Sequence, residues 1–398
     1  MNKLYQTDLE KHACEVFSNS LNEINNNAYK DKYLLANPLL SRNPYINNLL
    51  NRIYKREKAK GKVLLSTVAK KVILYYIKSF ALVFLWLAKK TAFHLSGYKN
   101  NRYAKSIKNQ TELVVVDIFS VVDNIKKNNF RDRNYLRGLD TILERNNVPY
   151  IYAPIFYGSH NPLKFYSIFK KIQTTNIDYI TDFELFQITE IIKIIKFILV
   201  YPWKVLNLCK SLNNSGNINK LIQEELVNTL ATTWHNYARR LMGEKLSNLH
   251  PKIKVLSWDE SQVIHKNFYR GLRDGSGVVN IIGCQFFLRH SIWVNLGVSE
   301  QEIKLGLVPN KILTNGKENI LCSGLKYEPG VSLRYLDLFD QPINSNGDDL
   351  KSLVLLSYFE KESYNLLRLV SKSTCTEDFL IKPHPALNLC FNESLNKK

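Results

Sequence analysis

The chain has 398 residues, of which 45% are hydrophobic and 23% charged, a composition typical of a folded globular protein and unlike that of a disordered one. This length favours two domains. The excess of 55 Lys and Arg over 35 Asp and Glu gives a formal net charge of +20, which favours an anionic partner such as phospholipid headgroups, nucleic acid or phosphorylated substrates. The six cysteines form no CxxC pair and no Cys/His cluster with zinc spacing, which argues against a structural metal and favours a reducing compartment.

The N-terminal region is polar and basic. Residues 1–60 are rich in Asn, and their weak periodicity predicts a loosely structured helical extension. We extend this first region to residues 1–108, a helical and basic segment that could associate with a membrane. The opening stretch MNKLYQTDLEKHACEVF lacks the apolar core of a secretory signal peptide, so we expect a cytoplasmic protein.

Two apolar segments that carry lysines favour peripheral attachment to the inner face of the cytoplasmic membrane. Residues 72–88 are apolar except for Lys78 and Ser79, whereas a membrane-spanning helix needs about 20 apolar residues. We therefore expect this helix to lie in the bilayer interface, with its lysines reaching acidic lipid. Residues 191–208 repeat the pattern, and Pro202 is expected to end or kink their helix. Each segment alone is equally compatible with a helix packed on a protein core.

From residue 109 onward the pattern becomes α/β, and we assign residues 109–342 to one Rossmann-like domain. The β-branched run at 113–119 predicts a strand buried on both faces, and a helix within 133–147 leads to a second strand at 148–156. A strand, helix and strand with short connections are typical of a right-handed parallel unit. A helical region follows from about 160 to 245. Further strands are predicted at 252–258, 278–287 and 318–324.

A second, shorter region follows a break. Residues 341–349, QPINSNGDD, have the composition of a linker. The remaining residues, 350–398, predict one more strand, helix and strand, and the last strand runs into the sequence KPHP at 382–385.

Three motifs carry a resemblance to bacterial surface-polysaccharide glycosyltransferases of the two-domain GT-B fold. KPHP at the end of a strand resembles their His-Pro motif. SWDESQVIHKNFYRGLRD at 257–274, followed by IIGCQ at 281–285, is similar to a strand, basic helix and strand of surface-carbohydrate biosynthesis proteins. VPNKILTNGKENILCSG at 308–324 resembles the strand-turn-strand that closes their N-terminal domain. One departure is Phe286, which stands where the family would show His after Gln.

The resemblance covers roughly residues 110 to 390. It implies an α/β, GT-B-like fold of two Rossmann-like domains, preceded by the basic helical extension. A typical domain has on the order of 150 residues, so residues 350–398 are expected to form only part of the nucleotide-sugar-binding domain. We therefore expect the chain to be C-terminally truncated relative to the family, with an incomplete donor site.

The donor-binding residues implied by the resemblance are Lys382, His384 and Pro385. At the carboxyl end of a parallel strand, a Lys supplies a point charge and a His donates a hydrogen bond to a phosphate. The prolines keep the adjacent backbone extended, which aims His384. Alternatively, Pro-His-Pro merely ends the strand.

Inverting glycosyl transfer also needs a general base, for which a partly desolvated carboxylate is suited. Glu260 is the preferred candidate because it follows the strand at 252–258, and Asp117 and Asp259 are the alternatives. A competing interpretation makes Asp259 and Gln262 a capping box of the next helix.

Further polar residues complete the predicted site. We assign Gln262, Arg270, Arg273 and Gln285 to acceptor or phosphate contacts, although exposed arginines are usually only solvated. The other histidines that we interpret as structural or surface residues are His94, His160, His235, His250 and His290. No metal ligand and no cofactor are predicted.

Together these features predict transfer of a sugar from a nucleotide-activated donor, with a cytidine nucleotide as the expected carrier, to a lipid-linked or polysaccharide acceptor. The alternative is a non-catalytic, membrane-bound scaffold of a polysaccharide assembly complex. A nucleic-acid partner is not expected, because the basic residues are scattered and no RNA-recognition or finger motif accompanies them.

Overall fold

The structure is a computed structural model of the chain, and it divides into two compact units, Met1–Leu336 and Asp337–Lys398. The residues that it describes are 12–13, 15–17, 19–20, 24, 28–43, 48–59, 65–98, 111–127, 130, 135–175, 177–212, 216–230, 234–287, 297–317, 320, 325–330, 333, 352–356, 360–372 and 379–382.

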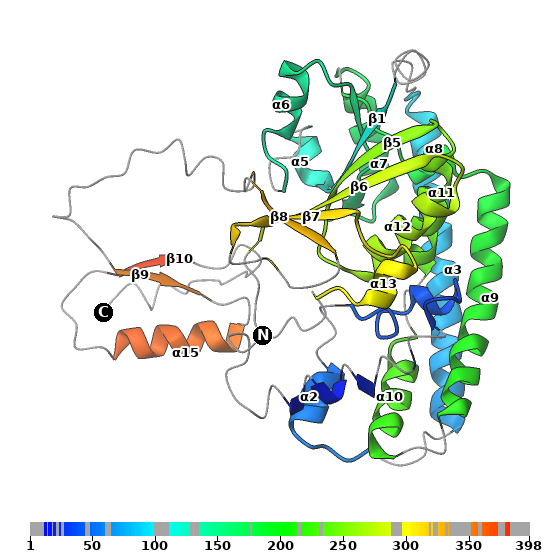
Figure 1. Ribbon diagram of the computed structural model, residues 1–398, viewed down its shortest axis with the longest axis vertical. Helices are drawn as coiled ribbons and strands as arrows, with labels where there is room; N and C mark the ends of the chain where they lie inside the picture. Colours follow the sequence, from blue (N-terminus) through cyan, green and yellow to red (C-terminus); the bar gives the residue numbers. More distant parts are fainter. Residues whose placement is uncertain are drawn as a thin grey trace. The chain divides into compact units, whose positions relative to one another are not determined.

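A six-stranded parallel sheet organises the first unit (Figure 1). In spatial order its strands are β3 (Tyr150–Tyr152), β1 (Leu113–Asp117), β5 (Lys252–Trp258), β6 (Val278–Gln285), β7 (Lys311–Asn315) and β8 (Lys326–Gly330). Every neighbouring pair is parallel, and all five residues of β1 are buried, as expected for a strand covered on both faces. From β1 the chain adds β3 on one side and β5 to β8 on the other. The strand order therefore reverses between β1 and β5, and in such sheets ligands bind beyond the carboxyl ends of the strands at this switch point.

Helices connect the strands and cover the sheet. In the first unit they are η1 (Leu34–Ala36), α2 (Asn48–Tyr54), α3 (Leu65–Leu95), α5 (Val122–Lys126), α6 (Leu139–Arg145), α7 (Pro162–Ile172), α8 (Asp182–Leu185), α9 (Ile188–Ser211), α10 (Asn217–Asn228), α11 (Trp234–Ser247), α12 (Val263–Asp274) and α13 (Glu300–Lys304). A further pair of short parallel strands, β2 (Phe119–Val121) and β4 (Ile155–Tyr157), follows β1 and β3.

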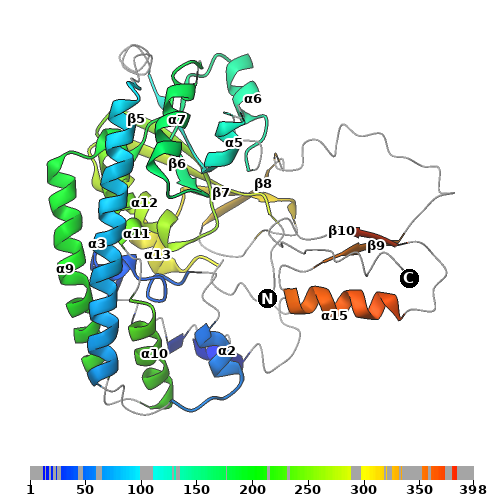
Figure 2. The ribbon, with the colours of Figure 1, turned by 180° about the vertical axis from the view of Figure 1, so that it is seen from behind.

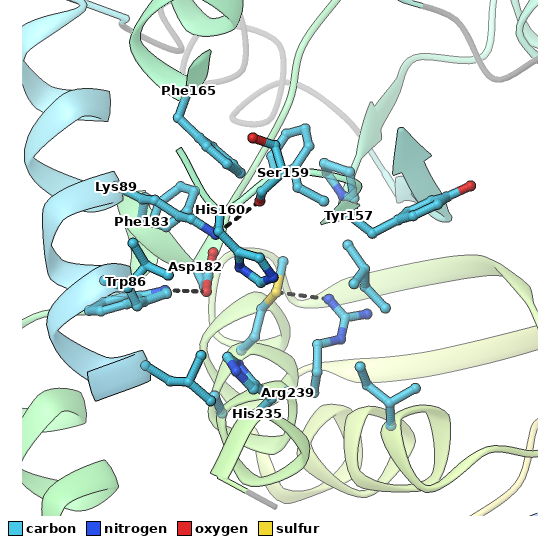
Figure 3. A pocket seen from close by; sticks show the side chains of 18 of the residues that line it. Trp86, Lys89, Tyr157, Ser159, His160, Phe165, Asp182, Phe183, His235 and Arg239 are labelled. Atoms are coloured by element: carbon cyan, nitrogen blue, oxygen red, sulfur yellow. Dashed lines mark hydrogen bonds between the residues drawn. The ribbon is translucent and has the colours of Figure 1, made fainter. Parts of the chain in front are cut away.

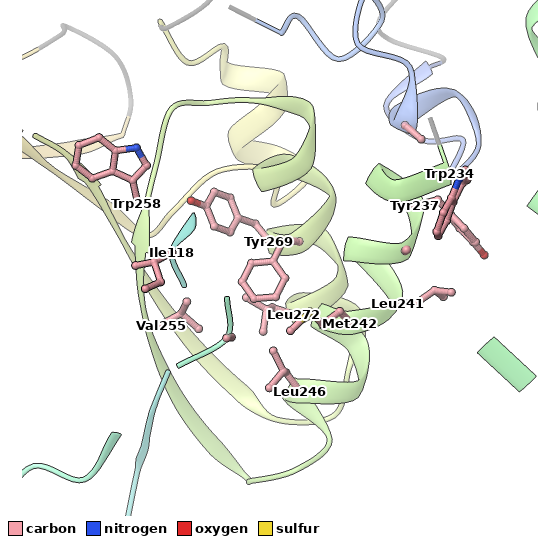
Figure 4. Close-up of a cluster of buried hydrophobic side chains, with 14 of the residues drawn as sticks. Ile118, Trp234, Tyr237, Leu241, Met242, Leu246, Val255, Trp258, Tyr269 and Leu272 are labelled. Atoms are coloured by element: carbon pink, nitrogen blue, oxygen red, sulfur yellow. The ribbon is translucent and has the colours of Figure 1, made fainter. Parts of the chain in front are cut away.

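Helices α11 and α12 cross closely beside the sheet. Figure 4 shows Met242 and Leu246 of α11 and Leu272 of α12 in one buried cluster with Val255 of β5. The crossing depends on glycine, because a Cβ atom on Gly271 would lie 1.9 Å from the Arg240 carbonyl oxygen. Each of the two helices also supplies polar side chains to the regions described below.

The two long helices α3 and α9 lie side by side (Figures 1 and 2), and the Tyr76 hydroxyl donates a hydrogen bond to the Leu199 carbonyl at 3.1 Å. Pro202 lies inside α9, which continues to Ser211, so of the two predicted outcomes, an end or a kink, the proline does not end the helix. Within the described part of the chain, α3 is the one helix long and apolar enough to cross a membrane, by length and composition.

The second unit contains β9 (Ser352–Leu355), α15 (Glu360–Ser371) and β10 (Phe379–Lys382), and β9 and β10 pair in parallel. The predicted strand, helix and strand are thus confirmed. The linker predicted at 341–349 lies outside the described residues, as do His384 and Pro385.

Other predicted elements differ in detail. The strand predicted at 113–119 is interrupted at Ile118, and the strand predicted at 148–156 is interrupted before Ile155. Most of the strand predicted at 318–324 lies outside the described residues, and Ile320 is not in a strand. The N-terminal residues are more deeply packed than their polarity predicts, since Leu34 to Leu40 bury their apolar side chains in the first unit. The six-stranded sheet is compatible with a Rossmann-like fold.

Candidate functional site

The carboxyl ends of β1 and β5 meet at the switch point, where Asp117 and Ser257 are register partners. Asp117 accepts hydrogen bonds from the Arg239 guanidinium at 2.6 Å and from the Ser257 hydroxyl at 2.7 Å. The Tyr269 hydroxyl donates in turn to Ser257 at 2.9 Å. Burial raises the pKa of Asp117 above its usual value, although Arg239 opposes this shift. Asp117 is 1% exposed, so its role in this arrangement is to hold Arg239 rather than to meet a substrate.

The loop after β5 brings together four of the predicted site residues. Asp259 accepts from the Ser261 backbone N–H at 2.9 Å and from the Gln285 amide at 3.2 Å. Burial raises the pKa of Asp259 to about 6. The two oxygens of Glu260 accept from the Trp258 indole at 2.7 Å and from the Gln262 amide at 2.6 Å. Glu260 is therefore a fixed, half-buried carboxylate at the carboxyl edge of the sheet.

The capping-box alternative for this loop is wrong. Helix α12 begins at Val263 with Gln262 as its N-cap residue, and the Gln262 side chain makes no capping hydrogen bond. Asp259 instead closes a tight turn onto Ser261, whose φ of 53° lies in the left-handed region that non-glycine residues seldom adopt. The loop is therefore held by its own hydrogen bonds before the helix starts.

The first turn of α12 supports the same loop. The Glu260 backbone N–H donates to Nδ1 of His265 at 3.4 Å, which requires an unprotonated Nδ1. Burial lowers the pKa of His265 to about 3, with smaller effects from Arg239 and Lys266. His265 is thus a neutral, buried residue that positions the loop.

Arg270 and Arg273 lie at the other end of α12 and bind the segment before β7. Arg270 donates to Asp274 and to the Leu305 carbonyl, both at 2.8 Å. Arg273 donates to the Gly306 carbonyl at 2.7 Å. Because these partners precede a parallel strand, both arginines lie towards the amino edge of the sheet, and the structure does not bring them to the loop of Glu260.

The remaining predicted residues belong to the second unit. Lys382 is the exposed last residue of β10. Of the predicted donor-binding set, His384 and Pro385 lie outside the described residues.

A cavity of about 360 Å³ lies beyond the carboxyl end of β3 (Figure 3). Its walls come from α3, from the segment Pro154 to His160, from α8 and α11, and from Ile264 in the first turn of α12. The polar and charged side chains that line it include Lys89, His160, Asp182, His235 and Arg239. Arg239 thus connects the cavity to Asp117, whereas Glu260 is not among the described residues that line it.

Burial acts on the charged groups of this cavity. It lowers the pKa of Lys89, whose ammonium donates to the Ser159 carbonyl at 3.3 Å and lies 4.6 Å from the centroid of the Phe165 ring. The His235 ring is open to the cavity, yet the surrounding protein atoms lower its pKa to about 4, with smaller effects from Lys89 and His160. Burial also raises the pKa of Asp182, whose carboxylate accepts from the Trp86 indole at 2.7 Å. Burial in this cavity therefore disfavours the charged forms of all three side chains.

Sequence reasoning missed the residues of this cavity. His160 and His235 were interpreted as structural or surface residues, and Arg239 was not singled out. A usable signal exists for His160, because YGSH directly follows the predicted strand at 148–156, where ligand-binding side chains gather. For Arg239 and His235, both on α11, the sequence holds no comparable signal.

Fold and site together define an α/β protein with a ligand-sized cavity at the carboxyl edge of a parallel sheet. No protein-family model matches this chain, and neither a curated protein nor a solved structure matches it. Within the described residues, no three His, Cys, Asp or Glu side chains converge as they would to hold a metal ion.

Proposed function

We propose that the chain is a glycosyltransferase-like protein of bacterial surface-carbohydrate biosynthesis, which transfers a sugar from a nucleotide-activated donor to a lipid-linked or polysaccharide acceptor. The observation that carries this proposal is the cavity beyond the carboxyl end of β3, which cationic side chains line, at the same edge of the sheet as the loop that fixes the Glu260 carboxylate. Such a position is where α/β proteins of this topology bind their ligands. The motif order from residue 257 to the KPHP sequence adds the carbohydrate-specific part of the proposal.

In this proposal the acceptor enters the first unit and Glu260 removes the proton of its hydroxyl group. The Trp258 and Gln262 hydrogen bonds hold the carboxylate in one orientation, as a general base requires. The hydrogen bond from the Gln285 amide to the Asp259 carboxylate helps to hold the conformation of the loop. The donor, with a cytidine nucleotide as the proposed carrier, is assigned to the second unit of a GT-B-type protein, where Lys382 and His384 would contact its phosphate.

We also propose that α3 and α9 attach the protein to the inner face of the cytoplasmic membrane. Apolar side chains on α3, at Ile73, Ile77 and Phe84, recur at helical spacing, and Phe84 is 69% exposed. On α9 the stripe continues through Ile192, Leu199 and Trp203, and Trp203 is 60% exposed.

Lysines accompany both stripes, including the exposed Lys70, Lys78, Lys193 and Lys196. A two-helix face with apolar side chains and basic flanks is complementary to an anionic bilayer surface. The protein should therefore sediment with membranes, and high salt should release much of it because salt screens the attraction between lysines and anionic lipid.

The test compares a deletion with a Glu260→Gln substitution in the bacterium that carries the gene. Loss of a surface carbohydrate in both strains, with normal levels of the variant protein in the membrane fraction, supports transfer by this site. Loss in the deletion alone would favour the non-catalytic scaffold. An unchanged surface carbohydrate in the deletion strain would contradict both roles.

A further inference from the structure

We infer that the cavity between α3, α8 and α11 binds the phosphate group of an amphiphilic phosphate ester. This inference deepens the proposed function, on which it rests for the ligand's biological role, because a lipid-linked acceptor has this chemistry. The binding itself follows from the cavity alone, through its size, its cations and its apolar walls.

The space is sufficient for a ligand. A volume of about 360 Å³ lies within the usual range for small-molecule sites. Most of the wall is apolar, with Leu82 and Leu85 of α3, Phe156 of β4 and Phe165 of α7 among its residues. These side chains suit a hydrocarbon group next to the phosphate better than they suit a nucleoside, whose base and sugar need many hydrogen-bond partners.

Two cations from different helices face this space with donors to spare. Arg239 binds Asp117 through Nη2, and its Nε is buried away from the cavity. Its Nη1 reaches the Met242 sulfur, a weak acceptor, at 3.0 Å, so Nη1 is the donor that remains for a ligand. The Lys89 ammonium carries three N–H groups, and the hydrogen bond to the Ser159 carbonyl uses one. In Figure 3, Lys89 and Arg239 lie on opposite sides of the histidine pair.

The other polar groups of the cavity are compatible with an anion. His160 and His235 each have an imidazole N–H that can donate to a phosphate oxygen, and the low pKa of His235 would rise beside a negative charge. Asp182 is the acidic side chain among the described residues of the lining, and the Trp86 indole already occupies one of its oxygens. A bound phosphate would thus add negative charge beside Lys89 and Arg239, on both of which Asp182 already acts.

The helix α3 links this site to the surface proposed for membrane attachment. Trp86 and Lys89 line the cavity, whereas Ile77 and Phe84 of the same helix are exposed. A ligand whose phosphate reaches Lys89 therefore lies one helix away from the bilayer in which its hydrocarbon chain would be anchored.

The experiment is calorimetric titration of the whole chain with octyl phosphate, inorganic phosphate and octanol. We expect octyl phosphate to bind at least about tenfold more tightly than either of the others, because it alone uses both the cations and the apolar walls. Equal binding of inorganic phosphate would show a site for free phosphate, and equal binding of octanol would show an apolar pocket. Either result, or no binding at all, would overturn the inference.

Substitutions test whether octyl phosphate binds in this cavity. Lys89→Gln should weaken octyl phosphate binding by about 10-fold to 100-fold, the usual value of a charge-assisted hydrogen bond. The control is Lys304→Gln on α13, where an exposed lysine loses the same charge outside both the cavity and the proposed membrane surface. His235→Ala, at a ring exposed to the cavity, should cost about threefold to tenfold and serves if Lys89→Gln folds poorly. Unchanged affinity in both cavity variants would contradict the assignment.

The phosphate site and the glycosyl-transfer role can be contradicted independently of each other. Octyl phosphate binding that is lost in the cavity variants, in a protein whose deletion leaves surface carbohydrate unchanged, would retain the phosphate site and remove the glycosyl-transfer role. The reverse result would retain the role and remove the site.

Discussion

Two buried charge clusters of the first unit resemble each other in composition and differ in purpose. The closed cluster joins Lys266 and Arg42 to Glu302, at 2.7 and 3.2 Å, and Tyr29 donates to the same carboxylate at 3.1 Å. The open cluster joins Arg239 to Asp117 at 2.6 Å. Beside the closed cluster the free space is about 10 Å³, roughly one water, whereas Arg239 borders about 360 Å³.

An unsatisfied donor does not distinguish the two clusters. Both Arg42 and Arg239 leave a buried Nε without a hydrogen-bond partner. What differs is the size of the space beside each cluster. The comparison teaches that a buried, incompletely paired cation is a candidate binding site only where there is space beside it for a ligand. Without that space, the charge cluster serves to stabilise the fold.

The pKa shifts of the buried groups also distinguish the closed cluster from the open cavity. Lys266 and Arg42 together outweigh burial and hold the pKa of Glu302 at about 2, so this carboxylate is charged and satisfied. In the open cavity, burial lowers the pKa of Lys89 although the Asp182 carboxylate opposes this shift, and it also lowers the pKa of His235. The nearby charges therefore outweigh burial in the closed cluster and do not outweigh it in the open cavity.

The largest expected effect comes from the helix crossing that both clusters share. Arg239 lies on α11 and Lys266 on α12, and Gly271→Ala would push a Cβ atom into the Arg240 backbone. We expect a loss of about 3 kcal/mol or more in the free energy of unfolding, because backbone cannot yield as a flexible side chain does. Urea unfolding measures it. Gly297→Ala is the control, since nothing lies within 4 Å of that Cβ position. Similar stability of the two variants would contradict the close crossing.

Glu302→Gln tests whether the closed cluster stabilises the fold. The substitution leaves two buried cations without their carboxylate, which typically costs about 3–5 kcal/mol. Gln can still form the capping box with Ser299, so the effect isolates the charge. Glu300→Gln, exposed on the same short helix, should change the unfolding free energy by less than about 0.5 kcal/mol. A small effect of Glu302→Gln would mean that the cluster does not stabilise the fold.

Acid should remove the stabilisation that the ionised Glu302 carboxylate provides. The folded-state pKa of Glu302 lies below its usual value of 4.5, so its contribution is fully present above that pH and is lost as the pH falls towards about 2. The loss should be on the order of 3 kcal/mol. Measured as the difference between wild type and Glu302→Gln, the stability gap should close across this range. A gap independent of pH would contradict the ionised pairing.

Asp117→Asn should strengthen ligand binding, whereas Lys89→Gln should weaken it. The amide oxygen can still accept from Ser257 or Arg239, while the negative charge behind the guanidinium disappears. We expect a loss of stability of about 3–5 kcal/mol, because the Arg239–Asp117 pair is as deeply buried as the Arg42–Glu302 pair. Affinity for octyl phosphate should rise by about tenfold, because Arg239 then offers an unneutralised charge. Weaker binding in this variant would show that Asp117 positions Arg239 more than it neutralises it.

The sequence predicted the parts of the fold that local pattern determines. The strands at 252–258 and 278–285, both of them rich in apolar residues, lie within their predicted limits. Ile118 could not be recognised as a break, because its apolar side chain continues the strand pattern while the backbone leaves the sheet. The burial of Leu34 to Leu40 also escaped prediction, since it depends on contacts with distant elements such as the hydrogen bond from Asn37 to Tyr201.

The site was predictable where it follows a strand and hidden where it lies on a helix. Asp117, Asp259 and Glu260 were found because each follows or ends a predicted strand, although Asp117 proved to be buried in an ion pair. Which side of α11 faces a cavity depends on how that helix crosses α12 at Gly271, and this is tertiary information. Arg239 and His235 could therefore be located only in three dimensions.

The most direct test compares both regions in one spectrum. In protein labelled with ¹³C at histidine Cε1 and assigned by single His→Gln substitutions, octyl phosphate is titrated in and each histidine resonance is followed by NMR. The open cavity predicts saturable shifts for His160 and His235 that are larger than the shift of His265, which lies next to Lys266 of the closed cluster and is influenced by Arg239. Unmoved signals from both cavity histidines, or an equal shift at His265, would contradict the claim that the open cluster is the ligand site.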